Sequence, residues 1–203
     1  IMLKDRKRNA IMQSKEMLIY PEKYKGDCMM KKYEIGLYEK AIRNTLSWSE
    51  KLKCAKECGY DYLEISIDAT DEKIKRIFMN ADEKKKIMEA VFETGLPIGS
   101  MSVSALTKYA LGDPKKETRD KAMQIAEKAI ELAVDLGVRT VMIPGYDIYF
   151  GESTIETKKY FLENVKKIAE IAEREGILVG FETMENNFMN TTGKAVQYVN
   201  MVD

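Results

Sequence analysis

The sequence predicts an α/β fold built from parallel βαβ units. Short apolar segments alternate five times with longer segments in which apolar residues recur at helical spacing. Glycines end the helical segments, polar loops follow the apolar ones, and no hairpin signal joins two apolar segments. Strands that alternate with helices pair in parallel through right-handed crossovers, so their carboxyl ends share one edge. Enzymes of this class carry their functional loops at that edge.

Local signals define the first two units. Ser47 and Glu50 form a capping-box pattern that starts a helix, and Gly59 ends it. Asp71 is expected to cap a short helix that contains Ile74 and Ile77. The elements expected here are strands at 33–38 and 62–67 and helices at 47–58, from residue 71, and at 82–94. The inward residues are expected to be Leu52, Cys54, Ala55 and Cys58 in the first helix and Ile87, Met88, Val91 and Phe92 in the third.

The second half repeats the pattern with longer helices. The remaining elements are expected to be strands at 97–103, 138–144 and 177–181, helices at 116–136, 153–175 and 192–201, and polar loops at 104–114 and 145–151. The inward residues are expected to be Ala122, Ile125, Ala126, Ala129, Ile130 and Ala133 in one long helix and Phe161, Val165, Ile168, Ile171 and Ala172 in the next. Two architectures fit this order: an open doubly wound sheet and a (β/α) barrel. No Gly-x-Gly-x-x-Gly follows the first strand, so nothing favours a dinucleotide-binding fold.

The composition is that of a globular protein. Of 203 residues, 45% are hydrophobic, and 33 basic residues balance 33 acidic ones, which gives no reason to expect a nucleic-acid or membrane partner. No apolar run approaches the roughly 20 residues that a membrane span needs. Cys28, Cys54 and Cys58 form no disulfide framework, and we expect the last two to be buried as small apolar residues rather than to bind metal. These features predict a cytoplasmic protein.

Residues 1–32 differ from the rest because Lys and Arg greatly outnumber Asp and Glu there. We interpret them as a basic, poorly ordered N-terminal extension rather than an arm that contacts RNA or lipid. Met29 and Met30 immediately precede the first expected strand, so we expect the natural start of the protein there. The folded domain is expected at residues 33–203.

The chain contains no histidine, which excludes Ser-His-Asp and Cys-His catalysis within it. Acid–base work must then fall to carboxylates, Lys, Tyr or Cys, and any metal site would be rich in oxygen ligands. Glu182 is the strongest candidate because it follows a short apolar run at 177–181 that is typical of a buried strand. A capping or salt-bridged glutamate is the alternative interpretation.

Further candidates lie at the same expected edge: Glu64, Tyr146, Asp147 and Asn190, with Tyr38 and Glu39 as weaker ones. Each also has a structural interpretation. Tyr146 and Asp147 would serve as loop structure, and Asn190 would cap a helix. Ser104 is expected to be a turn residue, and the alternating Lys and Glu of the long helices to be a solvated outer face.

Several collinear segments form a recognisable set. They are Ile35-Gly-Leu-Tyr-Glu-Lys-Ala41, Ser47-Trp-Ser-Glu-Lys-Leu52, Gly59-Tyr-Asp-Tyr-Leu-Glu-Ile-Ser-Ile-Asp68, Glu93-Thr-Gly95, Ser100-Met-Ser-Val-Ser-Ala105, Ala129-Ile-Glu-Leu-Ala133, Gly145-Tyr-Asp-Ile-Tyr149 and Glu182-Thr-Met-Glu-Asn-Asn-Phe-Met-Asn190. Together they resemble the L-ribulose-5-phosphate 3-epimerases, xylose-isomerase-like TIM barrels that act on L-xylulose 5-phosphate. The resemblance implies that residues 33–203 form five βα units of a partial TIM barrel.

The resemblance also implies a mechanism and a site. The family abstracts a proton next to a ketose carbonyl and uses a divalent metal ion held by two Glu, one Asp and one His. The metal would be Mn²⁺, Mg²⁺, Zn²⁺ or Co²⁺. Glu182 matches the first metal-binding Glu, and we expect it to be both catalytic residue and metal ligand. Glu64, Tyr146 and Asn190 are the expected substrate-binding residues, and the partner is a small sugar phosphate.

Two departures from the family pattern qualify this expectation. Leu106 stands where the family usually has a histidine, and the chain ends at Asp203, before the strands that carry the other metal ligands. We therefore expect an incomplete metal site and unpaired edge strands that favour a homo-oligomer. The alternative function is a catalytically inactive truncated barrel or a binding remnant.

Overall fold

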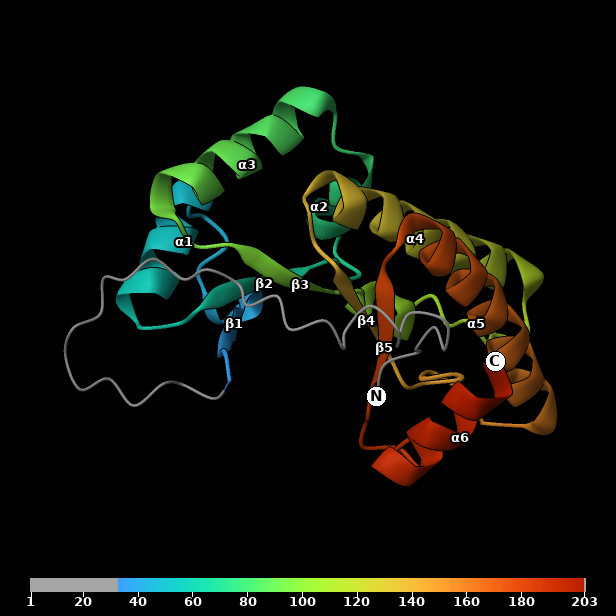
Figure 1. Ribbon diagram of the computed structural model, residues 1–203. Helices are drawn as coiled ribbons and strands as arrows, with labels where there is room; N and C mark the ends of the chain where they lie inside the picture. The colour runs from blue at the N-terminus through green and yellow to red at the C-terminus, as the bar shows by residue number, and fades with distance from the viewer. Residues whose placement is uncertain (1–32, 203) are drawn as a thin grey trace.

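The computed structural model describes residues 33–202 (Figure 1). The expectations for residues 1–32, including a start near Met29, lie outside the described residues, as do Cys28 and Asp203. Within 33–202, no helix combines the length and apolar character needed to cross a membrane.

Within the described residues, five parallel strands form one sheet in the order β1-β2-β3-β4-β5. Their bounds are Gly36–Tyr38, Tyr62–Ser66, Ile98–Ser102, Thr140–Pro144 and Leu178–Glu182. A doubly wound sheet reverses its strand order part-way, whereas here the order in the sheet is the order in the chain. This confirms the α/β class and selects the wall of a (β/α) barrel over the open sheet.

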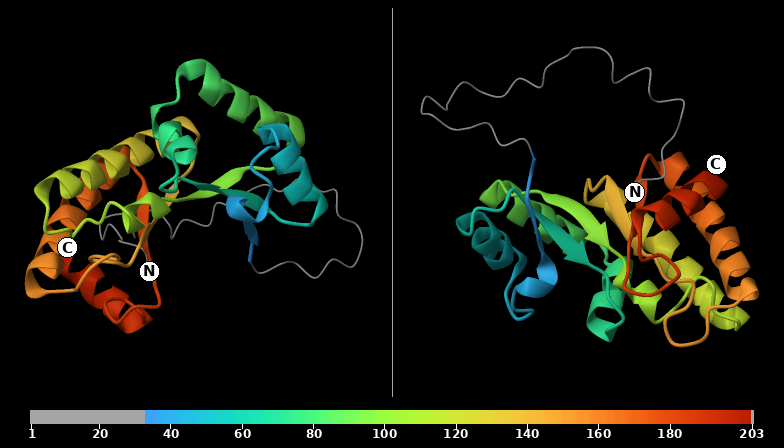
Figure 2. Two further views of the ribbon diagram at one scale, coloured as in Figure 1. Left: turned by 180° about the vertical axis from the view of Figure 1, so that it is seen from behind. Right: turned by 90° about the horizontal axis from the view of Figure 1, so that it is seen from below.

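The helices lie on one side of this sheet, as right-handed crossovers between successive neighbours require. They are α1 Trp48–Glu57, α2 Asp71–Ile74, α3 Ala81–Thr94, α4 Lys116–Asp135, α5 Ile155–Glu175 and α6 Thr192–Val202, with short 3-10 turns η2 Glu39–Ala41, η3 Lys75–Phe78 and η4 Ser104–Thr107. Figures 1 and 2 show α1 beside α3 and α4 beside α5, with the sheet open on its other side.

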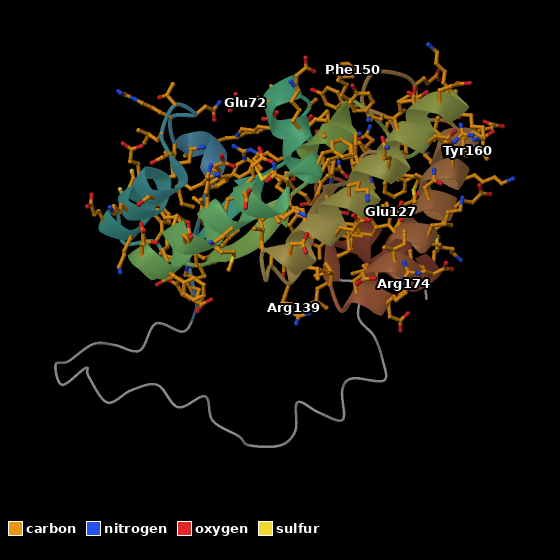
Figure 3. All side chains as sticks on the ribbon, turned by 90° about the horizontal axis from the view of Figure 1, so that it is seen from above. Glu72, Glu127, Arg139, Phe150, Tyr160 and Arg174 are labelled. Atoms are coloured by element: carbon orange, nitrogen blue, oxygen red, sulfur yellow. The ribbon has the colours of Figure 1, made fainter. Side chains whose placement is uncertain are left out.

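The core fills the space between strands and helices. Alternate strand residues such as Leu63, Ile65, Val141 and Phe181 are buried there, because successive side chains of a strand point to opposite faces. The inward residues expected for α4 and α5 are buried or pack against the core. On the outer helical surface, Glu127 of α4 and Arg174 of α5 are exposed (Figure 3), which agrees with the expected solvated face.

Several local expectations are confirmed and others are wrong. Ser47 and Glu50 form the capping box of α1. Thr70, not Asp71, caps α2 through its hydroxyl, because the chain enters the helix one residue earlier than expected. Asn80 caps α3 in a capping box with Glu83 that the sequence analysis missed. The loop expected at 104–114 begins with the 3-10 turn η4.

Two side-chain expectations fail for the same reason. Phe92 is 81% exposed, because the buried face of α3 runs through Ile87, Ala90 and Thr94. At about 100° per residue, position 92 lies well off that face. Cys58 is exposed and Cys54 only half-buried. In both helices, neighbouring residues occupy the core positions that were assigned to these side chains.

Candidate active site

Two of the predicted carboxylates lie on strands of the sheet. Glu64 of β2 accepts a hydrogen bond from the Ser100 hydroxyl of β3 at 2.6 Å. Glu182 is the last residue of β5. Burial raises the pKa of Glu182 above its usual value, the Glu64 charge raises it further, and the Lys40 charge partly opposes this. The structure therefore brings the two predicted glutamates and a lysine within electrostatic range of one another.

Backbone packing explains why Glu182 sits where it does. Gly176 ends α5 in the left-handed conformation, with φ 69°, which β5 follows after one residue. Glu182 pairs with Pro144 at the end of β4, and the Gly145 N–H donates to the Glu182 carbonyl at 2.9 Å. A side chain at Gly145 would put its Cβ 2.7 Å from that carbonyl oxygen. The loop after β4 can approach β5 this closely only with glycine.

Tyr146 connects the loops that follow β4 and β5. Its hydroxyl donates to Glu185 at 2.6 Å, and its ring packs edge-on against Tyr149. Burial and the Glu185 carboxylate raise the pKa of Tyr146, which keeps the phenol protonated. Glu185 was not among the predicted residues, although it follows Glu182 by three positions in the same polar loop. Its charge also raises the pKa of Glu182.

Asp147 organises the loop after β4 from inside. Its buried Oδ2 accepts hydrogen bonds from the hydroxyls of Ser153 at 2.7 Å and Thr157 at 2.6 Å. Its carbonyl accepts from the Gly112 N–H at 2.9 Å. Oδ1 has no hydrogen-bond partner among the described residues. Asp147 therefore ties this loop to the start of α5 and to the loop after β3, which favours its structural interpretation.

A buried ion cluster supports the end of β1. Glu39 is fully buried and accepts hydrogen bonds from Arg76 at 2.6 and 2.9 Å, from Lys51 at 2.7 Å and from the Ser66 N–H at 3.0 Å. Although burial opposes ionisation, the bonds from Arg76 and Lys51 lower the pKa of Glu39 to about 2. Glu39 is therefore held as a carboxylate, and these contacts assign it a structural role.

Cations exceed acids at this end of the site. Lys73 is buried, with its amine 3.9 Å from Glu39 and 4.0 Å from Asp68, and burial lowers the pKa of Lys73. Lys40 is 41% exposed, bonds to the Ser104 hydroxyl at 3.2 Å and lies 3.5 Å from Asp68. Glu39 is already paired with Arg76 and Lys51, and Asp68 is shared between Lys40 and Lys73, so these four cations outnumber the two acids within 4.0 Å of them among the described residues. This surplus suits an anionic ligand.

The remaining predicted positions lie at the start of α6 and in η4. Asn190 is exposed, and its Oδ1 accepts from the Lys194 amine at 2.8 Å. The Thr191 hydroxyl, rather than Asn190, bonds to the N–H of Lys194 in the first turn of α6. Leu106, where the resembled family has a histidine, is buried in the core.

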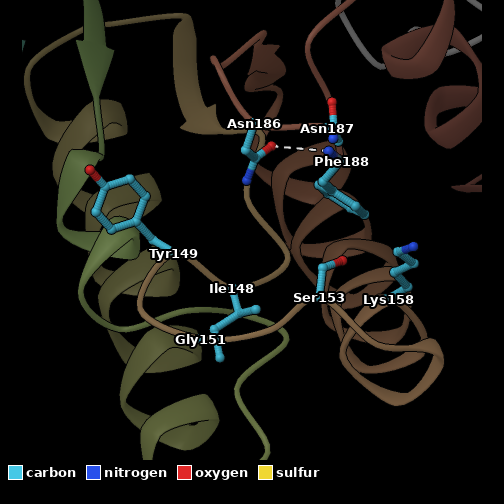
Figure 4. Close-up of a pocket in the computed structure, with 8 residues that line it drawn as sticks. All are labelled: Ile148, Tyr149, Gly151, Ser153, Lys158, Asn186, Asn187 and Phe188. Carbon is cyan, nitrogen blue, oxygen red and sulfur yellow. Dashed lines mark hydrogen bonds between the residues drawn. The ribbon is translucent and has the colours of Figure 1, made fainter.

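A cavity of about 380 Å³ opens between the same two loops (Figure 4). It is lined by Ile148, Tyr149, Gly151, Ser153, Lys158, Asn186, Asn187 and Phe188. Asn186 Oδ1 accepts from the Phe188 N–H at 3.1 Å, which folds the loop after β5 over the cavity. The cavity therefore lies beside the Tyr146–Glu185 bond rather than between the two predicted glutamates.

The described residues supply only part of the expected set of metal ligands. Carboxylate oxygens such as those of Glu182 and Glu64 are ligands that hard divalent cations accept. Within residues 33–202, however, no three His, Cys, Asp or Glu side chains come together in an arrangement that could hold a metal ion. Glu182 fits a metal site as one ligand, and no complete site exists among these residues.

Comparison with known proteins now identifies the fold family. The family model described as "Xylose isomerase-like TIM barrel" matches residues 52–203. The chain belongs to this family. Among solved structures, a D-psicose 3-epimerase from Clostridium cellulolyticum has a TM-score of 0.69 at 18% identity, covering 84% of this chain and 60% of that one. A 3-keto-D-glucoside 4-epimerase from Escherichia coli has a TM-score of 0.66 at 19% identity, covering 85% and 65%. At these identities the likeness shows the fold.

Curated relatives of this xylose isomerase-like TIM barrel are closer in sequence. A putative L-ribulose-5-phosphate 3-epimerase of Escherichia coli is 38% identical over 165 residues, which is 81% of this chain and 58% of the relative. An L-ribulose-5-phosphate 3-epimerase of Shigella boydii is 33% identical over 175 residues, or 86% and 62%. The chain thus spans about three-fifths of the length of these relatives.

Proposed function

We propose that the chain carries part of the active site of a sugar 3-epimerase that interconverts L-xylulose 5-phosphate and L-ribulose 5-phosphate. The observation that carries the proposal is that Glu182, the last residue of β5, lies within electrostatic range of Glu64 on β2 of the same parallel sheet. Sequence identity of 33–38% to relatives named for this reaction supports the same substrate class.

Glu182 is the proposed base. A general base works best when its pKa approaches the working pH, and burial and the Glu64 charge move the pKa of Glu182 in that direction. Removal of the proton at C3 of the ketose forms a C2=C3 double bond and moves the negative charge onto the former C2 carbonyl oxygen, which gives an enediolate. A second group that returns a proton to the opposite face of C3 then completes the inversion.

Glu64 and Tyr146 are proposed to orient the substrate. The Ser100 hydroxyl holds one oxygen of Glu64 at 2.6 Å, which leaves the other free to accept a hydrogen bond from a sugar hydroxyl. Tyr146, through Glu185, holds the loop after β5 against the loop after β4. Asn190 stays a candidate for substrate contact, because it is exposed at the end of the same loop.

A divalent metal ion is part of the proposal, and Glu182 is the residue of this chain that would hold it. Such an ion polarises a carbonyl oxygen and stabilises negative charge developing on an adjacent oxygen. The phosphate end of the substrate is proposed to lie toward Lys40 and Lys73, where positive charge exceeds negative. Asp68 lies 3.5 Å from the Lys40 amine and 4.0 Å from the Lys73 amine, which is too far for a short ion pair with either. A phosphate oxygen bound between the two amines would give them a closer anionic partner.

The proposal is tested by monitoring the conversion of L-xylulose 5-phosphate by NMR. The assay contains Mg²⁺ or Zn²⁺ rather than Mn²⁺, because the first two ions are diamagnetic. Glu182→Gln keeps the shape of the side chain but removes the base, so we expect conversion to fall about 10²-fold or more. Glu152→Gln is the matched control, because Glu152 is an exposed glutamate in the loop after β4. Conversion that survives Glu182→Gln would remove Glu182 from the reaction.

A further inference from the structure

Cys54 and Cys58 occupy one face of α1 at its C-terminal end. Cys58 is the residue at which the helix ends, and its N–H donates to the Cys54 carbonyl at 3.0 Å. Residues four apart lie above one another on a helix. Leu52 and Ala55 are the fully buried positions of α1, whereas Cys58 is exposed and Cys54 half-buried. The packing of α1 therefore does not depend on the two thiols.

The four-residue spacing also places the two thiols near each other. Partial burial raises the pKa of the Cys54 thiol, and the Cys58 thiol, through its charge and a hydrogen bond, raises it further. A thiol with a raised pKa stays protonated at neutral pH and is a weak nucleophile. A metal ion that binds such a pair must displace the protons, so its affinity rises with pH.

The spacing favours a bridging ion over a disulfide. Cβ atoms of residues four apart on a helix lie about 5–6 Å from each other. A disulfide requires about 3.8 Å, so it would have to open the last turn of α1. An ion bonded to both sulfurs inserts two bonds, each roughly 2.3 Å long for zinc. Those two bonds span the wider gap with the helix intact.

We propose that Cys54 and Cys58 form a two-thiolate site for monovalent copper. Zinc is four-coordinate in structural sites, and among residues 33–202 no three His, Cys, Asp or Glu gather to hold a metal. Soft sulfur ligands select monovalent copper instead. Binding replaces two S–H bonds by two Cu–S bonds and releases two protons, with no change in oxidation state.

This site lies away from the carboxylate edge of the sheet. The C-terminal end of α1 leads through the Gly59 turn into the start of β2, whereas Glu64 and Glu182 lie toward the strand carboxyl ends. The two ends of a βα unit face opposite sides of a barrel wall. Copper at the thiols is therefore independent of the proposed epimerase chemistry.

The test is anaerobic titration with monovalent copper against a chromogenic copper(I) chelator. All variants carry Cys28→Ser, because that third thiol lies outside the described residues. We expect Cys54→Ser and Cys58→Ser each to weaken binding at least about a hundredfold, because two linked ligands bind far more tightly than one. Binding by the pair should also tighten from pH 6 to pH 8. The 13 methionines, which are soft ligands as well, are the same in every variant.

A shifted pair is the decisive control. Lys53→Cys combined with Cys54→Ser keeps two thiols in α1 but separates them by five residues, and Lys53 is exposed. Circular dichroism checks that each variant keeps its helices. The proposal predicts that the shifted pair binds copper no better than a single thiol. Equal affinity for the shifted and native pairs, or for single-thiol variants, would overturn it.

Discussion

At the scale of single residues, charge and burial set the properties of the site. Glu182 is an exposed residue beside another carboxylate, and partial burial raises its pKa, whereas Glu39 is fully buried among cations. The same side chain therefore has a raised pKa in one place and a lowered pKa in the other. These opposite shifts separate a group suited to proton transfer from one that holds the fold.

The effect of Glu64 on Glu182 can be measured directly. Glu64→Gln replaces the carboxylate by an amide of nearly the same shape and removes its negative charge. We therefore expect the pKa of Glu182 to fall toward its ordinary value. Carboxyl carbon NMR in the presence of a chelator, which removes metal ions, reads this pKa. An unchanged pKa in Glu64→Gln would mean that the two side chains do not meet.

The lowered pKa of Glu39 predicts that the free energy of unfolding decreases in acid. Its pKa is about 2 when folded against 4.5 for an ordinary glutamate, so its contribution is complete above pH 4.5. The contribution is lost as pH falls from 4.5 through 2, and amounts to on the order of 3 kcal/mol. Urea unfolding at pH 7, 4.5 and 2.5 measures it. Glu39→Gln should be less stable at pH 7 and should lose this part of the pH dependence.

At the scale of elements, two glycine-bounded turns hold the site together. Gly176 directs the chain from α5 into β5, and Gly145 lets the loop after β4 lie against the end of β5. The sequence predicts the first from its position after a helix. It does not predict the second, because the close approach of Gly145 to Glu182 depends on a neighbour 37 residues away.

Gly145→Ala tests the loop contact. The new Cβ would meet the Glu182 carbonyl and the Met189 sulfur, both at 2.7 Å. We expect a loss of about 1–3 kcal/mol in the free energy of unfolding, read from denaturant midpoints. Gly193→Ala in α6 is the control, since its Cβ would meet only the Thr191 hydroxyl at 3.9 Å. Similar stabilities of the two variants would show that the approach is not tight.

At the scale of the whole molecule, chain order and sheet order coincide, which brings the carboxyl ends of all five described strands to one edge. The alternation of strands and helices predicts this fold, and it predicts that Glu64, Tyr146 and Glu182 share that edge. It does not predict the buried ion cluster, because Glu39 and Arg76 are 37 residues apart in the chain and meet only after folding. Helical periodicity also fails to predict that Phe92 and Cys58 are exposed. Other residues of the same helices occupy the core positions that the pattern assigned to these two side chains.

The central claim is that Glu182 removes the C3 proton of a phosphorylated ketose. Exchange of that proton with solvent deuterium tests it most directly, because exchange reports proton removal whether or not the epimer accumulates. With a divalent metal present, we predict deuterium at C3 of L-xylulose 5-phosphate with the native chain and with Glu152→Gln. We predict exchange slower by about 10²-fold or more with Glu182→Gln. Exchange at the native rate in Glu182→Gln, or none with the native chain, would contradict the account.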